Sequence, residues 1–120
     1  MENKGRLRSL SRRADFLQLK AHGFSFHVNS WLLVNLQKTS LNQIRCGWTI
    51  PRQIGSAVVR NRLRRWGREY LRKWCTDKNE SLDLNLIFKR KDKGFYKSVV
   101  HKEFDEAMDK LVVKLQRYRE

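Results

Sequence analysis

Five arginines fall within the nine positions from 60 to 68, and Glu69, which follows them directly, is the only acidic residue between 54 and 69. Like charges one turn apart on a helix repel each other by roughly a few tenths of a kcal/mol per pair. A polyanion along that face relieves the repulsion, because each planar guanidinium can donate two parallel hydrogen bonds to a phosphate. The stretch therefore predicts a phosphate-binding surface, although composition alone also allows a solvated helix with a chance cluster of arginines.

Side chains suited to catalysis are sparse in this sequence. His22, His27 and His101 are scattered, and no His, Asp and Glu cluster has the spacing of metal ligands. There is no glycine-rich phosphate loop and no nucleophile beside a base. Cys46 and Cys75 lie far apart without a CxxC motif, which argues against a disulfide or zinc site. We therefore expect no catalytic residue and no metal ligand in the protein itself.

Positive charge extends well beyond the arginine stretch. The 120 residues include 27 Lys and Arg against 12 Asp and Glu, a formal net charge of +15. Residues 1–76 hold 16 of these cations and only three acids. A field of this kind attracts polyanions to the first two thirds of the chain. Residues 1–10 are expected to form a basic, flexible N-terminal tail.

Length and hydropathy limit the class of protein. The length suits one domain over 1–120, and 40% hydrophobic residues suffice for a modest core. No run approaches the roughly 18 consecutive apolar residues of a membrane span. The N-terminus also lacks the apolar segment of a secretory signal. We therefore expect a cytoplasmic protein with no membrane partner.

Hydrophobic periodicity predicts that the arginines lie on a long helix with Ser56 as its N-cap. At about 100° per residue, an apolar stripe lies opposite the arginines on the helical wheel. The stripe consists of Val59, Leu63, Trp66, Tyr70 and Trp74.

Alternating apolar residues predict the strands that this helix packs against. They indicate a long or broken strand over 24–36, a second over 45–50 and a third over 82–88. The third is expected to have one wet face, which carries Asp83 and Asn85.

Two further helices complete the predicted domain. A short one is capped by Ser11 or Asp15 and ends at Gly23 in a left-handed conformation, and an amphipathic one starts near Ser98. Helices with one apolar stripe and strands with one apolar face indicate the α+β class, as a single-domain two-layer α/β sandwich.

The start of the long helix resembles the protein subunit of bacterial ribonuclease P. The resemblance rests on the Gly-x-Ala-Val-x-Arg-Asn-Arg motif at 55–62, followed by Arg64-Arg65 and Arg68-Glu69, and it runs from about Arg6 to Tyr118. It also includes Asp15-Phe16, His22-Gly23 and Gly47-Trp48-Thr49-Ile50. The resemblance implies a sheet of about four strands with three helices, in the order αβββαβα. It further implies a left-handed crossover through the arginine helix, against the usual right-handed rule.

The resemblance also implies a function. Family members are accessory subunits of the ribonucleoprotein endonuclease that removes the 5′ leader from precursor tRNA, and the RNA subunit performs the chemistry. The implied partners are this catalytic RNA and the leader, with no DNA, and the implied cofactor is Mg²⁺ held mainly by the RNA. A structural RNA-binding protein of ribosomal type shares the charge and size and stays an alternative. A DNA-binding helix is disfavoured, because the arginine helix also supplies core residues.

By the same resemblance, the RNA-binding residues lie on the arginine helix and just after the second strand. They are Arg52, Arg60, Asn61, Arg62, Arg64, Arg65 and Arg68. On the helical wheel Arg62 lies at the flank of the apolar stripe, so its expected role is partly structural. Asn61 suits either of two roles: ordering water or metal near phosphate, or capping backbone.

A cleft between the first helix and the sheet is implied to hold the single-stranded leader, through a basic groove and stacking on aromatic faces. The expected cleft residues are Phe16, Lys20, Val34 and Trp48. Lys20 and Val34 stand where relatives often carry aromatic residues, and Gln53 stands where many carry a lysine. Weaker stacking and a larger role for charge are therefore expected. Core packing is the alternative role for Phe16 and Trp48.

Overall fold

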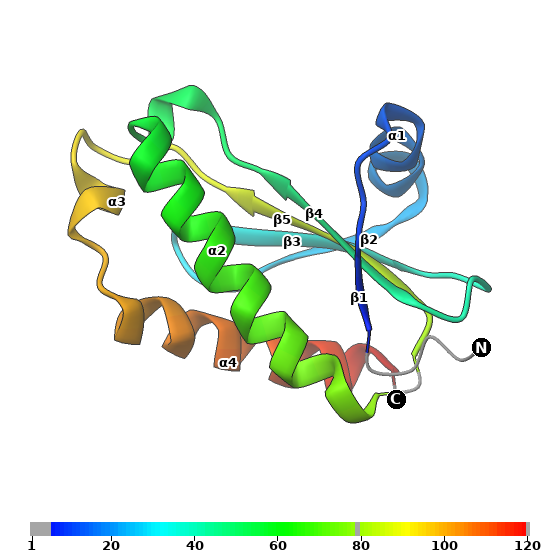
Figure 1. The fold of residues 1–120 in the computed structure, drawn as a ribbon. Coiled ribbons are helices and arrows are strands. Elements are labelled where there is room, and N and C mark those ends of the chain that lie inside the picture. The colour runs from blue at the N-terminus through cyan, green and yellow to red at the C-terminus, as the bar shows by residue number, and fades with distance from the viewer. Residues whose placement is uncertain (1–5, 79, 120) are drawn as a thin grey trace.

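The structure is a computed structural model that describes residues 6–78 and 80–119. A five-stranded sheet and four helices make up the fold (Figure 1). In chain order the elements are β1 (Leu7–Ser9), α1 (Arg13–His22), β2 (Phe24–His27), β3 (Leu32–Lys38), β4 (Ile44–Thr49), α2 (Ala57–Trp74), β5 (Leu82–Phe88), α3 (Phe95–Ser98) and α4 (His101–Arg119). Short 3₁₀ turns, Arg52–Ile54 and Cys75–Asp77, flank α2.

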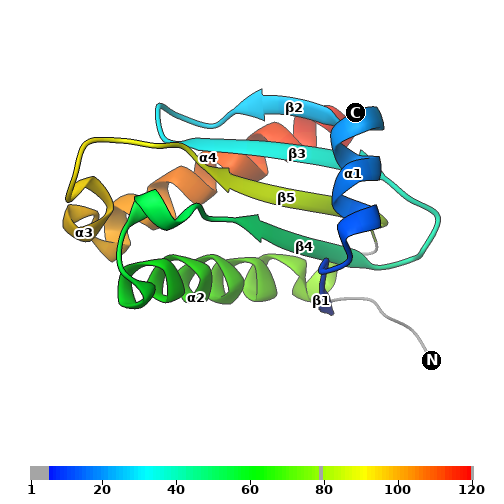
Figure 2. The same cartoon turned by 90° about the horizontal axis from the view of Figure 1, so that it is seen from above.

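The strand order is β1-β4-β5-β3-β2. Strands β1, β4 and β5 are parallel, and β3 is antiparallel to both of its neighbours, β5 and β2. Helices α2 and α4 cover one face of the sheet, and α1 crosses one end of the other face (Figures 1 and 2). The parallel neighbours β4 and β5 are joined through α2. In the two views this crossover is left-handed, as the resemblance implied. The predicted α+β sandwich is confirmed.

The core lies between the sheet and the pair α2 and α4. Val34, Leu36 and Leu86 point into it from the strands and are fully buried. Gly67 of α2 is required there, because a Cβ at this position would lie 2.5 Å from the indole of Trp48. This close approach of helix and strand fixes which side of α2 faces the sheet.

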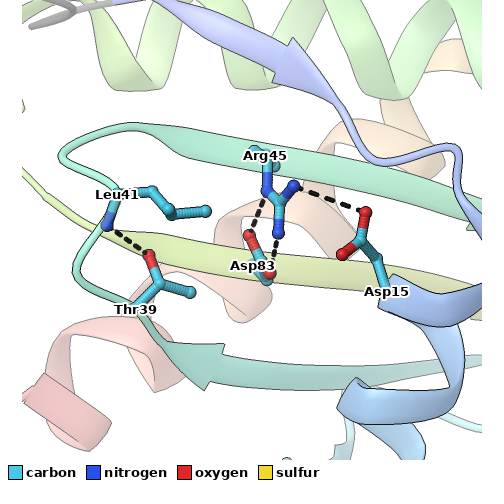
Figure 3. Close-up of polar contacts among 5 residues, drawn as sticks. All are labelled: Asp15, Thr39, Leu41, Arg45 and Asp83. Atoms are coloured by element: carbon cyan, nitrogen blue, oxygen red, sulfur yellow. Dashed lines mark hydrogen bonds and ion pairs between the residues drawn. The ribbon is translucent and has the colours of Figure 1, made fainter.

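The opposite face of the sheet is more covered than expected. Asp83 and Asn85, predicted on a wet face, are only 6% and 7% exposed. The Arg45 guanidinium donates from Nε to Asp83 Oδ1 at 2.7 Å and from Nη2 to Oδ2 at 2.6 Å, and its Nη1 lies 3.4 Å from Asp15 of α1 (Figure 3). Asp83 raises the pKa of Arg45 through this hydrogen bonding. The network therefore attaches α1 to β4 and β5 and shields the polar face from water.

The N-terminal segment departs from the prediction. Residues 7–9 form β1 beside β4, and Leu10 is buried. The expected flexible tail over 1–10 is therefore wrong for residues 7–10, and residues 1–5 lie outside the described part. A fifth strand is added to the four implied, because the backbone of residues 7–9 pairs with the free edge of β4.

The helix boundaries show three smaller departures. Neither Ser11 nor Asp15 caps α1: Arg12 is its N-cap, without a side-chain hydrogen bond. Gly23 does end α1, but its φ is −81°. Glycine is needed there because a Cβ would lie 2.4 Å from the Leu19 carbonyl. The helix expected near Ser98 is split into α3 and α4.

Candidate RNA-binding site

The arginine helix α2 begins as predicted. The Ser56 hydroxyl accepts a hydrogen bond from the Val59 amide at 3.3 Å, which satisfies one of the free N–H groups of the first turn. The Arg60 side chain turns back and donates from Nε to the Gly55 carbonyl at 3.2 Å. Thus the first arginine of the motif also holds the turn that starts the helix.

The buried side of α2 orients the arginines. The buried residues of the helix are Val59, Leu63, Trp66, Gly67 and Leu71, while Tyr70 and Trp74 of the predicted stripe are partly buried. Tyr70 also donates to Asp109 of α4 at 2.5 Å, and burial together with this hydrogen bond raises its pKa. Because this side is fixed against the sheet and α4, most arginines lie on the outward side.

The outward side carries a cationic surface, here called the arginine surface, which includes Arg60, Asn61, Arg64 and Arg65. Asn61 is exposed, and its Oδ1 accepts a hydrogen bond from Arg64 at 2.7 Å, which orients that guanidinium. The Arg65 side chain is 63% exposed, and its Nε lies 3.9 Å from Glu69. A contact of this length between exposed groups holds the side chain weakly, so Arg65 is free to bind a phosphate.

Further cations continue this surface toward β1. Arg68 and Arg72 line a small hollow beside β1 and β4, together with Arg8 and Ser9. Arg52 is exposed in the turn before α2, next to exposed Gln53.

Arg62 differs from its neighbours. Its Nη2 donates to the carbonyls of Tyr96 and Lys97, at 3.0 and 3.3 Å, and its guanidinium lies 5.0 Å from the centre of the Trp66 ring. The side chain thus joins α2 to α3, in agreement with the partly structural role expected from the helical wheel.

The second surface is a cleft of about 480 Å³ between α1 and the sheet, here called the α1 cleft. The strands contribute Ser25 from β2, Leu33 and Asn35 from β3, Thr49 from β4, and Asn85 and Ile87 from β5; α1 contributes Phe16, Leu17 and Lys20. The cleft therefore crosses four strands. Phe16 and Lys20 line it as expected, and the Phe16 ring also lies over Gly47, where a Cβ would be 2.5 Å from it.

Val34 and Trp48, the other two expected cleft residues, lie on the opposite face of the sheet. Val34 is fully buried in the core, and Trp48 packs against Gly67. Successive side chains of a strand point to opposite faces, so the cleft receives the adjacent residues Leu33, Asn35 and Thr49 instead. The alternation in the sequence separates these two sets correctly, but it does not say which of them the short helix covers.

The floor of the α1 cleft carries polar groups beside the aromatic ring. Asn85 Nδ2 donates to Thr49 Oγ1 at 2.9 Å, so these two side chains satisfy each other. Asn35 is only 6% exposed, and its Oδ1 has no hydrogen-bond partner among the described residues. This Oδ1 atom faces Gly23, where a Cβ would lie only 2.5 Å from it. Apolar side chains (Leu17, Leu33 and Ile87) line the rest of the cleft, so it combines apolar and aromatic faces, on which bases can stack, with a lysine and amides that can bind the polar parts of a nucleotide strand.

A basic helix on one side of the sheet and a cleft lined by apolar, aromatic and polar side chains on the other are features of an RNA-binding α+β protein. Residues 5–112 match the family model described as Ribonuclease P. The ribonuclease P protein component of Thermotoga petrophila is 31% identical over 116 residues, which cover 97% of this chain and 96% of that protein. The protein component from Desulfosudis oleivorans is 32% identical over 82 residues, 68% of this chain and 67% of that one. The chain belongs to the ribonuclease P protein family.

Solved structures agree with this assignment. The RNase P protein from Thermotoga maritima is 29% identical and superposes with a TM-score of 0.74 over 92% of this chain and 96% of that one. The Staphylococcus aureus RNase P protein, 19% identical, shares the fold with a TM-score of 0.76 over 90% of this chain and 94% of that one. The family is that of the protein components of a tRNA-processing ribonuclease, so the RNA of this ribonucleoprotein is the partner of the chain. The ribosomal alternative is thereby set aside.

The described residues contain neither a membrane-spanning helix nor a cluster of metal ligands. No helix within 6–78 and 80–119 is long and apolar enough to cross a membrane. Over the same residues, no three His, Cys, Asp or Glu side chains are grouped so that they could hold a metal ion. The thiols of Cys46 and Cys75 are buried, and burial raises the pKa of each.

Proposed function

We propose that this chain is the accessory subunit of a cytoplasmic ribonuclease P whose RNA subunit cuts the 5′ leader from precursor tRNA. The arginine surface binds the RNA subunit and the RNA near the scissile phosphate. The α1 cleft holds the single-stranded leader. The observation that carries this proposal is the pairing of an outward arginine surface on α2 with a cleft across four strands on the other face.

Electrostatics supports the role of the arginine surface. Asn61 orients the Arg64 guanidinium through Nη1, and Arg65 makes a long contact to Glu69, so both guanidinium groups keep N–H donors for a phosphate. Guanidinium groups bind phosphates through two parallel hydrogen bonds and release condensed counterions when they do so. Because Arg62 is already engaged with α3, we assign phosphate binding to the other arginines of α2 and to Arg52.

The side chains that line the α1 cleft support its role in leader binding. Phe16 offers a ring for base stacking, and Lys20 offers a positive charge next to it. Proteins bind single strands through this combination of basic groove and aromatic platform. The polar floor satisfies part of its own hydrogen bonds through Asn85 and Thr49, so unpaired bases can lie on it without leaving many polar groups unpaired.

The residues of the arginine surface do not fit a magnesium ion of their own. Mg²⁺ prefers carboxylate oxygen and water, whereas Glu69 is the only acid of this stretch and Asn61 Oδ1 already accepts from Arg64. We therefore assign the Mg²⁺ of the reaction to the RNA subunit. The protein side chains neutralise phosphates around it, which lowers the repulsion between the two RNAs.

Reconstitution tests the proposed function directly. Cleavage of a precursor tRNA is measured with the RNA subunit from the same organism, with and without this chain, over a magnesium series. We expect the chain to lower the Mg²⁺ concentration needed for cleavage, because its cations replace part of the screening. The chain without the RNA subunit is expected to leave the precursor intact.

Two variants separate the surfaces in the same assay. Lys20→Gln is expected to weaken binding of precursor tRNA but not of leaderless tRNA, whereas Arg65→Gln weakens assembly with the RNA subunit. Lys102→Gln, an equal charge change on exposed α4, serves as control. Cleavage by the chain alone, or an unchanged magnesium requirement with folded chain present, would contradict the proposal.

A further inference from the structure

A second cluster of aromatic and basic side chains lies at the far edge of the sheet. Its groove, of about 330 Å³, is lined by residues of β2 and of the end of α4. Together with one lysine of β3 that contacts it, this aromatic–cationic patch consists of Phe24, Phe26, Lys38, Lys114, Arg117 and Tyr118. The α1 cleft uses none of these residues.

The rings of the patch are arranged as a stacking platform. Phe24 is 50% exposed, although it is a large apolar residue, and its ring stacks on Tyr118 with centroids 5.4 Å apart and planes 25° apart. Phe26 lies 6.1 Å from Phe24 in a tilted arrangement. A further planar ring on the exposed side of Phe24 would continue this stack, and nucleobases bind aromatic side chains in this way.

The charges beside the rings are all of one sign. Lys38 Nζ lies 5.5 Å from the centre of the Tyr118 ring, and Lys114 Nζ lies 5.6 Å from that of Phe26. Arg117 completes the lining, and among the residues that the structure describes none that lines the groove is acidic. Cations placed beside stacked rings match the phosphates and bases of a single-stranded nucleic acid, whereas an apolar peptide would leave them without partners.

The position of the patch connects it to the α1 cleft. Strand β2 is the edge of the sheet, with Ser25 in the α1 cleft and its neighbours Phe24 and Phe26 in the patch. In Figure 2 the end of α1 and the C-terminal end of α4 both fall at the β2 edge of the sheet, and Figure 1 shows that they lie on opposite faces of it. A strand that crosses the cleft from β4 to β2 therefore arrives at the patch when it passes over the edge.

We infer that the aromatic–cationic patch binds the distal part of the precursor-tRNA leader, after the leader has crossed the α1 cleft. This inference rests on the proposed function of that cleft. The path from β4 to β2 covers three strand spacings, about 14 Å. A strand stacked as in a duplex, with a rise of about 3.4 Å per nucleotide, spans this path with about four nucleotides, and an extended single strand spans it with fewer. Only leaders longer than those that fill the cleft reach the patch.

Leader length provides the test. Affinity of the assembled ribonucleoprotein is measured for precursor tRNAs with leaders of about two and about twelve nucleotides, lengths chosen to fall short of the patch and to pass it. Phe24→Leu keeps the apolar cover but removes the ring, so we expect about fivefold or greater loss for the long leader and none for the short one. Phe24→Trp is expected to retain the affinity of the long leader.

The charges give an independent readout. For the long leader, Lys114→Gln is expected to make the dependence of log K on log salt shallower by about 0.7, the value for one phosphate contact of a single strand. Lys102→Gln, at the start of the same helix, is expected to leave it unchanged. Photo-crosslinking from thiouridine placed in the distal leader is expected to label β2 or the end of α4.

The outcomes separate this inference from the proposed function. Phe16→Leu in the α1 cleft is included as the reference for leader binding. If it weakens leader binding and the patch variants do not, the inference is wrong and the proposed function stands. Equal losses for both leader lengths would assign the patch to the RNA subunit or to folding, and would also overturn it. If neither set of variants affects leader binding, the proposed cleft fails together with the patch.

Discussion

Two arginines three positions apart on α2 are predicted to affect different properties when replaced: Arg62 the stability of the fold, and Arg65 the binding of RNA. Arg62→Gln removes a guanidinium that donates to two carbonyls of α3 and lies over Trp66. Hydrogen bonds from a charged donor contribute about 1.5–3 kcal/mol, and one Nη2 makes both contacts, so they count once. A partly exposed cation–π contact adds about 0.5–1 kcal/mol. We therefore expect a loss of about 2–4 kcal/mol in the free energy of unfolding.

Arg65→Gln is expected to leave stability almost unchanged. Its side chain is 63% exposed, and its contact to Glu69 is 3.9 Å long, so the change in unfolding free energy stays within about 0.5 kcal/mol. The variant instead loses a phosphate contact, and the salt dependence of log K for the RNA subunit becomes shallower by about 0.7–0.9. The two variants carry the same change in net charge, which removes nonspecific electrostatics as an explanation.

Thermal unfolding and RNA binding over a salt series measure the two effects. For a chain of this size, about 0.25 kcal/mol/K of unfolding entropy converts the loss at Arg62 into a fall in Tm of about 8–16 °C. The salt series for Arg62→Gln is read well below its Tm. If Arg62→Gln left Tm unchanged and flattened the salt dependence, the assignment of Arg62 to the contact with α3 would be refuted.

Three further predictions follow from buried contacts. Arg45→Gln leaves the carboxylate of Asp83, whose side chain is 9% exposed, without its charged partner and should cost about 3 kcal/mol in urea unfolding; Asp15→Asn, which loses only a 3.4 Å contact, should cost less than about 1 kcal/mol. Gly47→Ala places a Cβ 2.5 Å from the Phe16 ring, so it should displace that ring and weaken leader binding, and unchanged binding would argue against Phe16 as the stacking residue. Because burial raises the pKa of both thiols, a disulfide reagent at pH 8 should label the chain only after denaturation.

Local signals in the sequence predicted the elements that carry the site. Ser56 caps α2 as expected because the N-cap interaction involves only residues within one turn. Strand β1 was missed because three residues carry no measurable periodicity, and this strand depends on the edge of β4. The wet face assigned to Asp83 was wrong because Arg45 and α1, distant in sequence, cover it. Local rules thus located helices and strands, while contacts between distant segments decided what covers them.

The difference between local patterns and contacts of distant segments also explains why only Phe16 and Lys20, of the four expected cleft residues, line the α1 cleft. Period-2 alternation predicts that Val34 and Leu33 face opposite sides of the sheet. Both sides are covered, however, one by α2 and α4 and the other in part by α1. Hydrophobicity cannot separate the two sides when each carries leucine or valine. The polar residue Asn35 can, because a side chain that needs hydrogen bonds is placed more readily beside a cleft than inside an apolar core. The same reasoning, applied to Ser25 between Phe24 and Phe26, assigns the serine to the cleft and the two rings to the patch beyond the edge of the sheet.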